Sequence, residues 1–292
     1  MKIGIHGKKE IDRQSAAFIE LIFEILSRNS AELFVSSKFD RNLGSSGFDK
    51  FNWKTYEPGN SLKKIDAFLS IGGDGTLLES VTHVAQSEKP ILGINIGRLG
   101  FLATISREET EHALQKLFEK DYTIDKRAML RLDSNKKLFG NLNFALNDFT
   151  VVKKDSSSMI TMHTYIDGEF LNSYWADGLI IATPTGSTGY SLSCGGPLVF
   201  PRSGNFVITP VSPHNLAVRP IVVSDNSEIT FEIEGRSKKF LVSLDSRTAT
   251  VDASIKLKVR KEAFSANLIL LEGQHYFKTL RQKLNWGLDI RN

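Results

Sequence analysis

The sequence predicts a chain of two parts, an α/β domain followed by a mostly-β domain. Up to about residue 125, short apolar runs alternate with segments whose apolar residues recur at helical spacing. This alternation is typical of a parallel sheet covered by helices. Beyond residue 126, strand-like runs follow one another directly. We therefore expect an α/β domain at residues 1–125 and a mostly-β domain at residues 126–271.

The α/β domain is expected to begin with a strand at Lys2–His6 and a helix at Asp12–Ser27. Apolar residues recur at helical spacing in that helix, which indicates core packing. Between Ser36 and Ser61 the chain is rich in Gly, Ser and Asn and shows no clean period, so we expect a mobile loop. Further strands are predicted at Ala31–Val35, Ala67–Ile71 and Ile91–Ile96, and helices at Thr76–Ala85 and Glu108–Lys120.

The second domain is predicted to consist of short strands. Asp167-Gly168 lies between two of them and indicates a hairpin, because Gly accepts the positive φ of a tight turn. The tail at residues 272–292 carries apolar side chains among basic ones, so it either packs back on the first domain or stays loose. The predicted strands are Ala128–Leu132, Asn143–Val152, Met159–Ile166, Gly178–Ala182, Phe206–Pro210, Ile229–Ile233 and Phe240–Leu244.

The composition, 41% hydrophobic and 24% charged, is that of an ordinary globular protein. The net charge of +4 is spread along the chain, so it is weak evidence for a nucleic-acid partner. Cys194 is the only cysteine, which excludes an internal disulfide and a cysteine metal cluster. No apolar run is long enough to cross a bilayer. We expect a cytoplasmic protein without nucleic-acid or membrane partners.

The first candidate site lies where the strand Ala67–Ile71 runs into Gly72-Gly73-Asp74-Gly75-Thr76. Glycines let phosphate oxygens approach the backbone, and the free N–H groups at the start of the next helix favour an anion. A carboxylate there repels phosphate, unless it takes a proton from an attacking hydroxyl or holds a cation. Asp74 is thus a candidate base; the alternative is a helix cap through the amides of Thr76 or Leu77.

The amino-acid sequence of this glycine loop argues against two other kinds of nucleotide site. It lacks Gly-x-x-x-x-Gly-Lys-Ser/Thr, the pattern of a Walker-type phosphate cradle. It also lacks Gly-x-Gly-x-x-Gly, the pattern of a dehydrogenase-type dinucleotide fold. The six histidines show no metal-ligand spacing such as His-x-x-x-His, so we expect structural roles for them.

The second candidate site follows the strand Gly178–Ala182, where hydroxyls and glycines dominate from Thr185 to Ser193. Small hydrogen-bonding groups beside the aromatic face of Tyr190 suit a nucleoside with a ribose and an adenine. The alternative is a surface loop, although loops seldom adjoin so apolar a strand. Ser187 is outside a Gly-x-Ser-x-Gly elbow, which counts against nucleophilic catalysis, and Cys194 is expected to pack.

These two segments, with Gly93–Ala103 and Asn147-Asp148, resemble the NAD kinase family in motif order and spacing from about Ile71 to Arg247. The glycine loop alone is also similar to diacylglycerol-type lipid kinases and ATP phosphofructokinases, so the later segments choose between them. The resemblance implies a Rossmann-like N-terminal domain and a β-sandwich-like C-terminal domain, with NAD bound between them. It also implies an enzyme that converts NAD and ATP to NADP and ADP, as a homodimer or homotetramer.

The resemblance implies a role for each matched residue. Asp74 would accept the proton of the adenosine 2′-hydroxyl as that oxygen attacks the terminal phosphate of ATP, while Gly75 and Thr76 hold phosphates. A divalent cation, Mg²⁺ by this likeness, would neutralise those phosphates. The residues that would bind the dinucleotide are Asn147 and Asp148 at a ribose or the adenine edge, Asp177 at the nicotinamide side or a ribose, Thr185, Thr188, Gly189, Tyr190, Ser191, Leu192 and Ser193 along the site, and Arg247 at a phosphate or the adenine face.

The chain departs from the family pattern at several positions. Asp148 stands where the family usually has Glu, which shortens the reach of the carboxylate. Gly189 stands where Ala is frequent, and Glu79 where a basic residue is frequent. Two other functions remain open: a related kinase for a lipid or a sugar phosphate, and a non-catalytic sensor that binds NAD without turnover.

Overall fold

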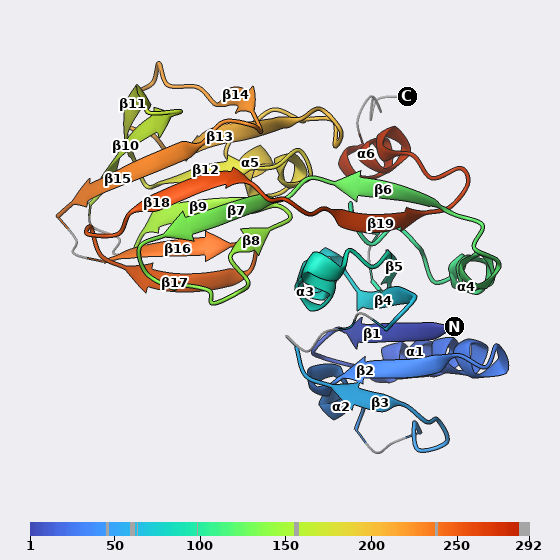
Figure 1. Ribbon diagram of the computed structural model, residues 1–292. Helices are drawn as coiled ribbons and strands as arrows, with labels where there is room; N and C mark the ends of the chain where they lie inside the picture. The colour runs from blue at the N-terminus through green and yellow to red at the C-terminus, as the bar shows by residue number, and fades with distance from the viewer. Residues whose placement is uncertain are drawn as a thin grey trace. The chain divides into compact units, whose positions relative to one another are not determined.

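The computed structural model describes residues 1–44, 47–58, 62, 64–97, 99–154, 158–236 and 239–285. The chain divides into two compact units, residues 1–126 with 266–292 and residues 127–265. Each unit is built around its own sheet system (Figure 1). Among the described residues, every helix is too short or too polar to span a bilayer.

The first unit is a seven-stranded sheet in the order β3-β2-β1-β4-β5-β19-β6 (Figure 1). The pairs from β3 to β19 are parallel, as the alternation of strands and helices predicted. Its elements are β1 (Lys2–Gly7), α1 (Arg13–Arg28), β2 (Glu32–Ser36), α2 (Ser37–Leu43), β3 (Lys54–Tyr56), β4 (Ala67–Gly72), α3 (Asp74–Val84), η1 (Ala85–Ser87), β5 (Ile91–Asn95), α4 (Thr110–Glu119), β6 (Thr123–Arg127), β19 (Ala266–Leu270) and α6 (Tyr276–Leu284).

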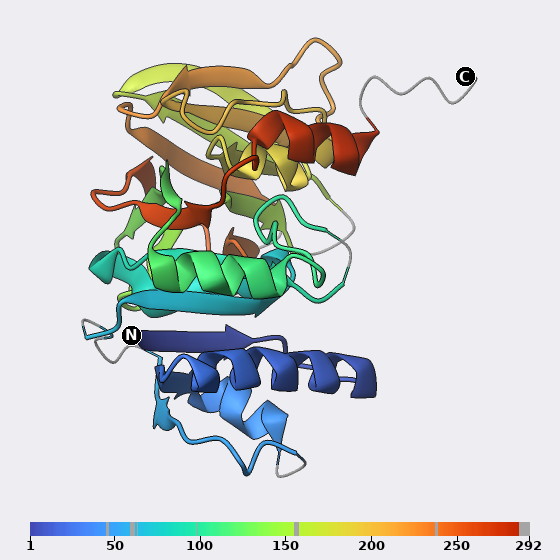
Figure 2. The same cartoon turned by 90° about the vertical axis from the view of Figure 1, so that its right-hand side faces the viewer.

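Helices cover both faces of this sheet. The apolar stripe of α1, from Phe18 to Leu26, packs in one core with Ile3, Ile5 and Leu69 of the strands and with α4. In Figure 2 the helices α1 and α4 both lie on the side of the sheet that faces the viewer. Side chains alternate between the faces of a strand, so His6 lies on the opposite face, where its ring contacts His83 of α3. The sheet therefore separates the α1 and α4 side from the α3 side.

The mobile loop expected between Ser36 and Ser61 is wrong for much of its length. Ser36 caps α2 by accepting a hydrogen bond from the Phe39 amide at 3.3 Å, and β3 pairs with β2 as an edge strand. Phe39 is fully buried and lies so close to Gly7 that a Cβ there would come within 2.1 Å of its ring. Residues 45, 46 and 59–61 of the predicted loop lie outside the described residues.

The second unit contains two antiparallel sheets, ordered β11-β10-β15-β18-β7-β8 and β14-β13-β12-β9-β16-β17. One hydrophobic core includes residues of both sheets, among them Phe149, Phe231 and Phe240, as expected for a β-sandwich-like fold. Its elements are β7 (Leu130–Ser134), β8 (Phe144–Ala145), β9 (Asp148–Lys153), β10 (Ile160–Ile166), β11 (Glu169–Ala176), β12 (Gly178–Ala182), η2 (Gly186–Thr188), α5 (Tyr190–Ser193), β13 (Asn205–Val211), β14 (Ile221–Ser224), β15 (Ile229–Gly235), β16 (Phe240–Leu244), β17 (Arg247–Val251) and β18 (Leu257–Lys261).

The structure confirms the predicted turn at Asp167-Gly168 and places the strand β19 in the other unit than expected. Asp167 and Gly168 have φ of 52° and 85° and connect β10 to β11, which confirms the predicted hairpin. Residues 266–271, expected in the second domain, contain β19, which pairs with β5 in the sheet of the first unit. A single five-residue strand shows the same hydrophobic pattern in either sheet, so the pattern does not reveal to which sheet β19 belongs.

Candidate active site

The glycine loop connects β4 to α3 in the first unit. Gly72 is required by close packing, because a Cβ there would lie 2.2 Å from the Thr76 hydroxyl oxygen. Gly73 and Gly75 have open space where a Cβ would be, so a ligand can approach their backbone. Among the described residues, no side chain caps the start of α3 at Gly73, which leaves its first amides for an anion.

Asp74 is held by backbone amides from a distant loop. Its Oδ2 accepts a hydrogen bond from the Phe101 amide at 2.8 Å, and its Oδ1 accepts from the amides of Leu102 and Ala103, both at 3.0 Å. Gly100 has no room for a side chain, since a Cβ would lie 1.9 Å from Oδ1. The helix-cap alternative is therefore wrong in this structure: Asp74 binds residues 101–103, and Arg98 of the same segment lies outside the described residues.

Glu79 lies one turn beyond this loop, at a position where the family often has a basic residue. Its negative charge is engaged by other side chains of the first unit. Its carboxylate forms an ion pair with Lys38 at 2.6 Å and lies 3.4 Å from Nε2 of His6. The hydrogen bond from His6 and the bond and charge of Lys38 lower the pKa of Glu79 to about 2, against the cost of its burial. The charge of Glu79 is thus compensated within its own neighbourhood.

In the second unit, residues 146–148 are fixed by Asp245, a residue outside the predicted site. The Asp245 carboxylate accepts from the amides of Leu146 at 3.0 Å, Asn147 at 2.8 Å and Asp148 at 3.2 Å. Asp245 directly follows the predicted strand Phe240–Leu244, without a motif around it. Burial raises the pKa of its carboxyl group, and the hydrogen bonds from the three amides oppose that rise.

A second set of contacts fixes Asn147 against the hydroxyl-rich segment. The Thr183 amide donates to the Asn147 carbonyl at 2.8 Å, and the Thr183 hydroxyl donates to the Leu146 carbonyl at 2.5 Å. Gly186 packs directly on Asn147, because a Cβ there would lie 2.0 Å from the Asn147 carbonyl oxygen. Within the described part of the chain, the side-chain oxygen Oδ1 of Asn147 is buried and has no hydrogen-bond partner.

The predicted residues from Thr185 to Ser193 divide into two groups. Thr185 and Ser191 are buried and bonded within the unit, Thr185 to Arg127 and Ser191 to the Thr209 hydroxyl at 2.8 Å. Tyr190 is 45% exposed. The residues of this segment that reach the surface are Thr188, Gly189, Tyr190, Leu192 and Ser193. Cys194 packs against a small apolar cluster, as expected.

Asp177 and Arg247 are both engaged with protein groups. Asp177 forms an ion pair with Lys153 at 2.6 Å and is partly exposed. The Arg247 guanidinium donates to the carbonyls of Leu142 and Phe144, and it lies over the Phe144 ring at 5.6 Å from the centroid. The structure thus places Arg247 as a support for the segment that leads into residues 146–148.

Comparison with known proteins identifies the family. The ATP-NAD kinase N-terminal domain model matches residues 4–122, and the ATP-NAD kinase C-terminal domain model matches residues 146–271. The chain belongs to the NAD kinase family. This membership makes it an NAD kinase enzyme, and the lipid-kinase, sugar-phosphate-kinase and sensor alternatives no longer stand.

Full-length relatives agree with this family assignment. The chain is 52% identical to an NAD kinase of Cytophaga hutchinsonii and 47% identical to one of Flavobacterium psychrophilum, with 100% of each chain covered. Among solved structures, an NAD kinase from Archaeoglobus fulgidus in complex with ATP has a TM-score of 0.73 and 26% identity, covering 98% of this chain and 99% of that one. Yeast NADH kinase complexed with NADH shares the fold, with a TM-score of 0.83, 23% identity and coverage of 100% and 89%.

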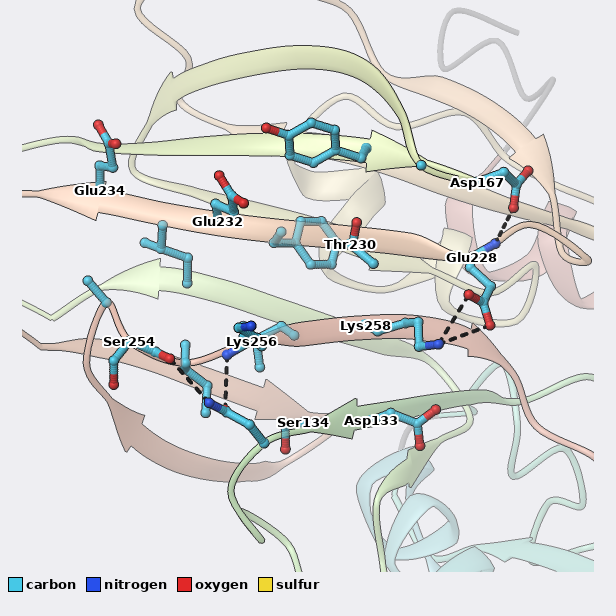
Figure 3. A pocket seen from close by; sticks show the side chains of 18 residues that line it. Asp133, Ser134, Asp167, Glu228, Thr230, Glu232, Glu234, Ser254, Lys256 and Lys258 are labelled. Atoms are coloured by element: carbon cyan, nitrogen blue, oxygen red, sulfur yellow. Dashed lines mark hydrogen bonds and ion pairs between the residues drawn. The ribbon is translucent and has the colours of Figure 1, made fainter.

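A wide hollow on the second unit is a poor site for this NAD kinase's substrates. It has a volume of about 1220 Å³ and opens between β15 and β18 (Figure 3). Its lining contains none of the predicted site residues. Its lining has more carboxylates than lysines, and Lys258 is paired with Glu228 at 3.1 Å, so its walls are mostly acidic (Figure 3). The charged lining residues are Asp133, Asp167, Glu228, Glu232 and Glu234 with Lys256 and Lys258. Such walls repel the phosphates of NAD and ATP.

Asp148 is nearly buried, and its only described side-chain hydrogen bond comes from the Thr150 hydroxyl at 3.1 Å. Burial, and then the neighbouring charge of Asp245, raise the pKa of Asp148 from 3.8 to about 7. The carboxyl group is therefore part protonated at neutral pH. In this form Asp148 can donate a hydrogen bond as well as accept one.

This raised pKa predicts a pH-dependent stability. The folded state holds the Asp148 proton up to about pH 7, whereas the unfolded chain releases it near pH 3.8. The stabilisation is present at low pH and is lost as pH rises through 7. As the pH rises from 5 to 8, the wild type loses this stabilisation and Asp148→Asn does not. We therefore expect the unfolding free energy of the variant to rise by roughly 2 kcal/mol relative to that of the wild type over this range. Urea unfolding at both pH values measures this, and a constant difference between the two proteins would show that Asp148 ionises normally.

Proposed function

We propose that this enzyme transfers the terminal phosphoryl group of ATP to the 2′-hydroxyl of the adenosine ribose of NAD, with Asp74 as the general base. A carboxylate offers about four lone-pair positions. Three of those of Asp74 accept backbone amides, two on Oδ1 and one on Oδ2. One position on Oδ2 remains, and it can accept the proton of an incoming hydroxyl. The amides fix the direction in which that lone pair points.

The phosphates are proposed to bind at the backbone next to Asp74. Gly73 and Gly75 leave the backbone open, and the first amides of α3 favour negative charge. Thr76 adds a hydroxyl, while Glu79 on the next turn is neutralised by Lys38. A divalent cation such as Mg²⁺ is proposed to bind here through the substrate phosphates, since Mg²⁺ keeps several waters and is commonly held by substrate phosphates. When bound, it neutralises phosphate charge.

The NAD side of the proposal depends chiefly on one observation, the buried and unpartnered Oδ1 of Asn147. A buried acceptor without a donor costs about 1–3 kcal/mol, so such an atom indicates a ligand donor. An adenine amino group or a ribose hydroxyl supplies that donor. We propose that Asn147 and Asp148 bind the adenosine part, and that Asp177 binds a ribose or the nicotinamide side. We assign contacts along the dinucleotide to the residues that reach the surface, Thr188, Gly189, Tyr190, Leu192 and Ser193. Thr185, Ser191 and Arg247 bond to other protein groups and hold the binding segments in position.

A single substitution tests this assignment. Asn147→Ala removes the acceptor, and we expect the KM for NAD to rise about tenfold or more while the KM for ATP changes little. Asn226→Ala, at an exposed position of the same unit, is the matched control and is expected to leave both constants unchanged. Equal affinity for NAD in Asn147→Ala and in the control would remove Asn147 from the site.

We further propose that the enzyme is a cytoplasmic homodimer or homotetramer. The single cysteine is consistent with a reducing compartment. Light scattering of the purified protein measures its mass in solution against the 32.6 kDa of one chain. A mass equal to one chain at all concentrations would contradict the oligomer.

A further inference from the structure

A cluster of two histidines and one glutamate lies on the α3 side of the sheet in the first unit. His6 of β1, Glu79 and His83 of α3 each place one potential ligand atom within 4.8 Å of the others. His6 is 1% exposed and His83 5% exposed, while Glu79 is half-buried. Nε2 of His6 lies 3.4 Å from Oε2 of Glu79. The proposed chemistry of phosphoryl transfer uses none of these three side chains.

Each imidazole is oriented through its Nδ1 by a hydroxyl group. Nδ1 of His6 lies 2.7 Å from the Ser36 hydroxyl, and Nδ1 of His83 lies 2.6 Å from the Tyr56 hydroxyl. In metal sites, the ring nitrogen that does not bind the ion is usually held in this way. Nε2 is then the nitrogen of each ring that remains for a ligand.

A buried hydroxyl without a partner lies beside this cluster. Ser70 of β4 is the register neighbour of His6 on β1, and neighbours in a parallel pair project from the same face. The Ser70 oxygen is buried and, in the described part of the chain, has no hydrogen-bond partner. An unpaired buried oxygen on the strand position next to His6 is an independent indication that a ligand belongs here.

We propose that His6, Glu79 and His83 form a binding site for a divalent transition-metal ion of the Zn²⁺ class. Two imidazole nitrogens and one carboxylate oxygen are a donor set that Zn²⁺ uses, with a further position left for water or a hydroxyl. Mg²⁺ and Ca²⁺ prefer sites made of oxygen ligands alone, so they are not the ions that this cluster selects. The ion would join the end of β1 to α3, the helix whose first residue is Asp74.

Lys38 and the ring positions set the expected strength of this site. Lys38 takes Oε1 of Glu79 at 2.6 Å, which leaves Oε2 for the ion. The ammonium charge repels a cation, so it weakens metal binding. Two ligands about 2.1 Å from one ion are at most about 4.2 Å apart, so the side chains must close on it. The imidazole rings, now 4.5 Å apart and inclined by 31°, can turn about their soft terminal torsions.

A cobalt titration tests the proposal without any activity measurement. Tag-free protein is stripped with a chelator, checked for folding by circular dichroism, and titrated with Co²⁺. We expect one Co²⁺ per chain, visible d–d absorption bands of a nitrogen-ligated site, and displacement by Zn²⁺. His83→Gln and Glu79→Gln are each expected to weaken Co²⁺ binding at least tenfold. His112→Gln, at an exposed histidine on α4, is the matched control and should bind as the wild type does.

A fourth variant separates binding at Glu79 from binding elsewhere. Lys38→Met removes the competing ammonium group, so we expect Co²⁺ to bind more tightly than to the wild type. An affinity unchanged by this substitution would place the ion away from Glu79 and overturn the proposal. So would the absence of stoichiometric Co²⁺ uptake, or equal affinity in wild type, His83→Gln and Glu79→Gln. Glu79 is half-buried, so Glu79→Gln keeps the test valid if His83→Gln fails to fold.

Discussion

Asp74→Asn is expected to lower kcat about a hundredfold to ten-thousandfold, the range typical of a lost general base. The substitution keeps the shape of the side chain but removes its charge and its proton affinity. One of its two terminal atoms becomes an NH₂ donor, which faces amides that now donate to the carboxylate. Steady-state kinetics with NAD and ATP measures the effect. Asp49→Asn, an exposed aspartate in the same unit, is the matched control.

A companion variant distinguishes the base from its support. Gly100→Ala leaves the carboxylate intact but places a Cβ within 1.9 Å of Oδ1, so Asp74 must shift. We expect kcat to fall in this variant too, because small misplacements of a catalytic group are costly. Near-normal kcat in Asp74→Asn would reduce Asp74 to an anchor of residues 101–103. A lower kcat in Gly100→Ala together with a normal kcat in Asp74→Asn would show that turnover depends on the position of the loop and not on the Asp74 carboxylate as a base.

Asp245→Ala is expected to cost about 3 kcal/mol of stability and to weaken NAD binding. The substitution leaves the amides of Leu146, Asn147 and Asp148 without their acceptor, and each unsatisfied buried donor costs about 1–3 kcal/mol. Removing a buried carboxyl group recovers part of that cost, so the effects do not simply add. Urea unfolding measures the stability. The KM for NAD should rise more than the KM for ATP, because Asn147 loses its fixed position.

Asp252→Ala is the control for this second prediction. Asp252 is exposed and bonds to Lys136 and Ser254 at the surface, so its loss is expected to leave the unfolding free energy nearly unchanged. Asp245→Asn retains one acceptor oxygen, so its loss of stability should fall between the losses of Asp245→Ala and Asp252→Ala. If Asp245→Ala and Asp252→Ala lost equal stability and bound NAD equally, Asp245 would have no positioning role.

The fold was predictable from sequence where apolar periodicity was strong and local. The strands β4 and β5 are fully buried, so their predicted ranges Ala67–Ile71 and Ile91–Ile96 fall within a residue of the structure. Helix α2 was missed because it has only two buried apolar residues, Phe39 and Leu43, within Gly-, Ser- and Asn-rich surroundings. Phe39 packs against Gly7, a contact that the sequence does not reveal. The predicted strand Asn143–Val152 is two strands, β8 and β9, because Asp245 takes the amides between them.

The candidate site was predictable where its residues carry a local motif. Asp74 among glycines and the segment from Thr185 to Ser193 are visible in the sequence. Asp245 is not, because its partners are backbone amides 97 to 99 positions away, and backbone amides leave no signature in residue types. The His6 and Glu79 pairing was also missed: His83 follows Glu79 by four residues on one helix face, but His6 comes from a distant strand.

This chain is expected to make NADP from NAD with ATP as the phosphoryl donor. Purified protein is incubated with NAD, ATP and Mg²⁺, and NADP is read out with an NADP-specific dehydrogenase, beside the Asp74→Asn variant prepared in the same way. We expect steady NADP formation by the wild type and about a hundredfold less, or lower still, by the variant. Absence of NADP with ATP and with every other phosphoryl donor tried would contradict the claim.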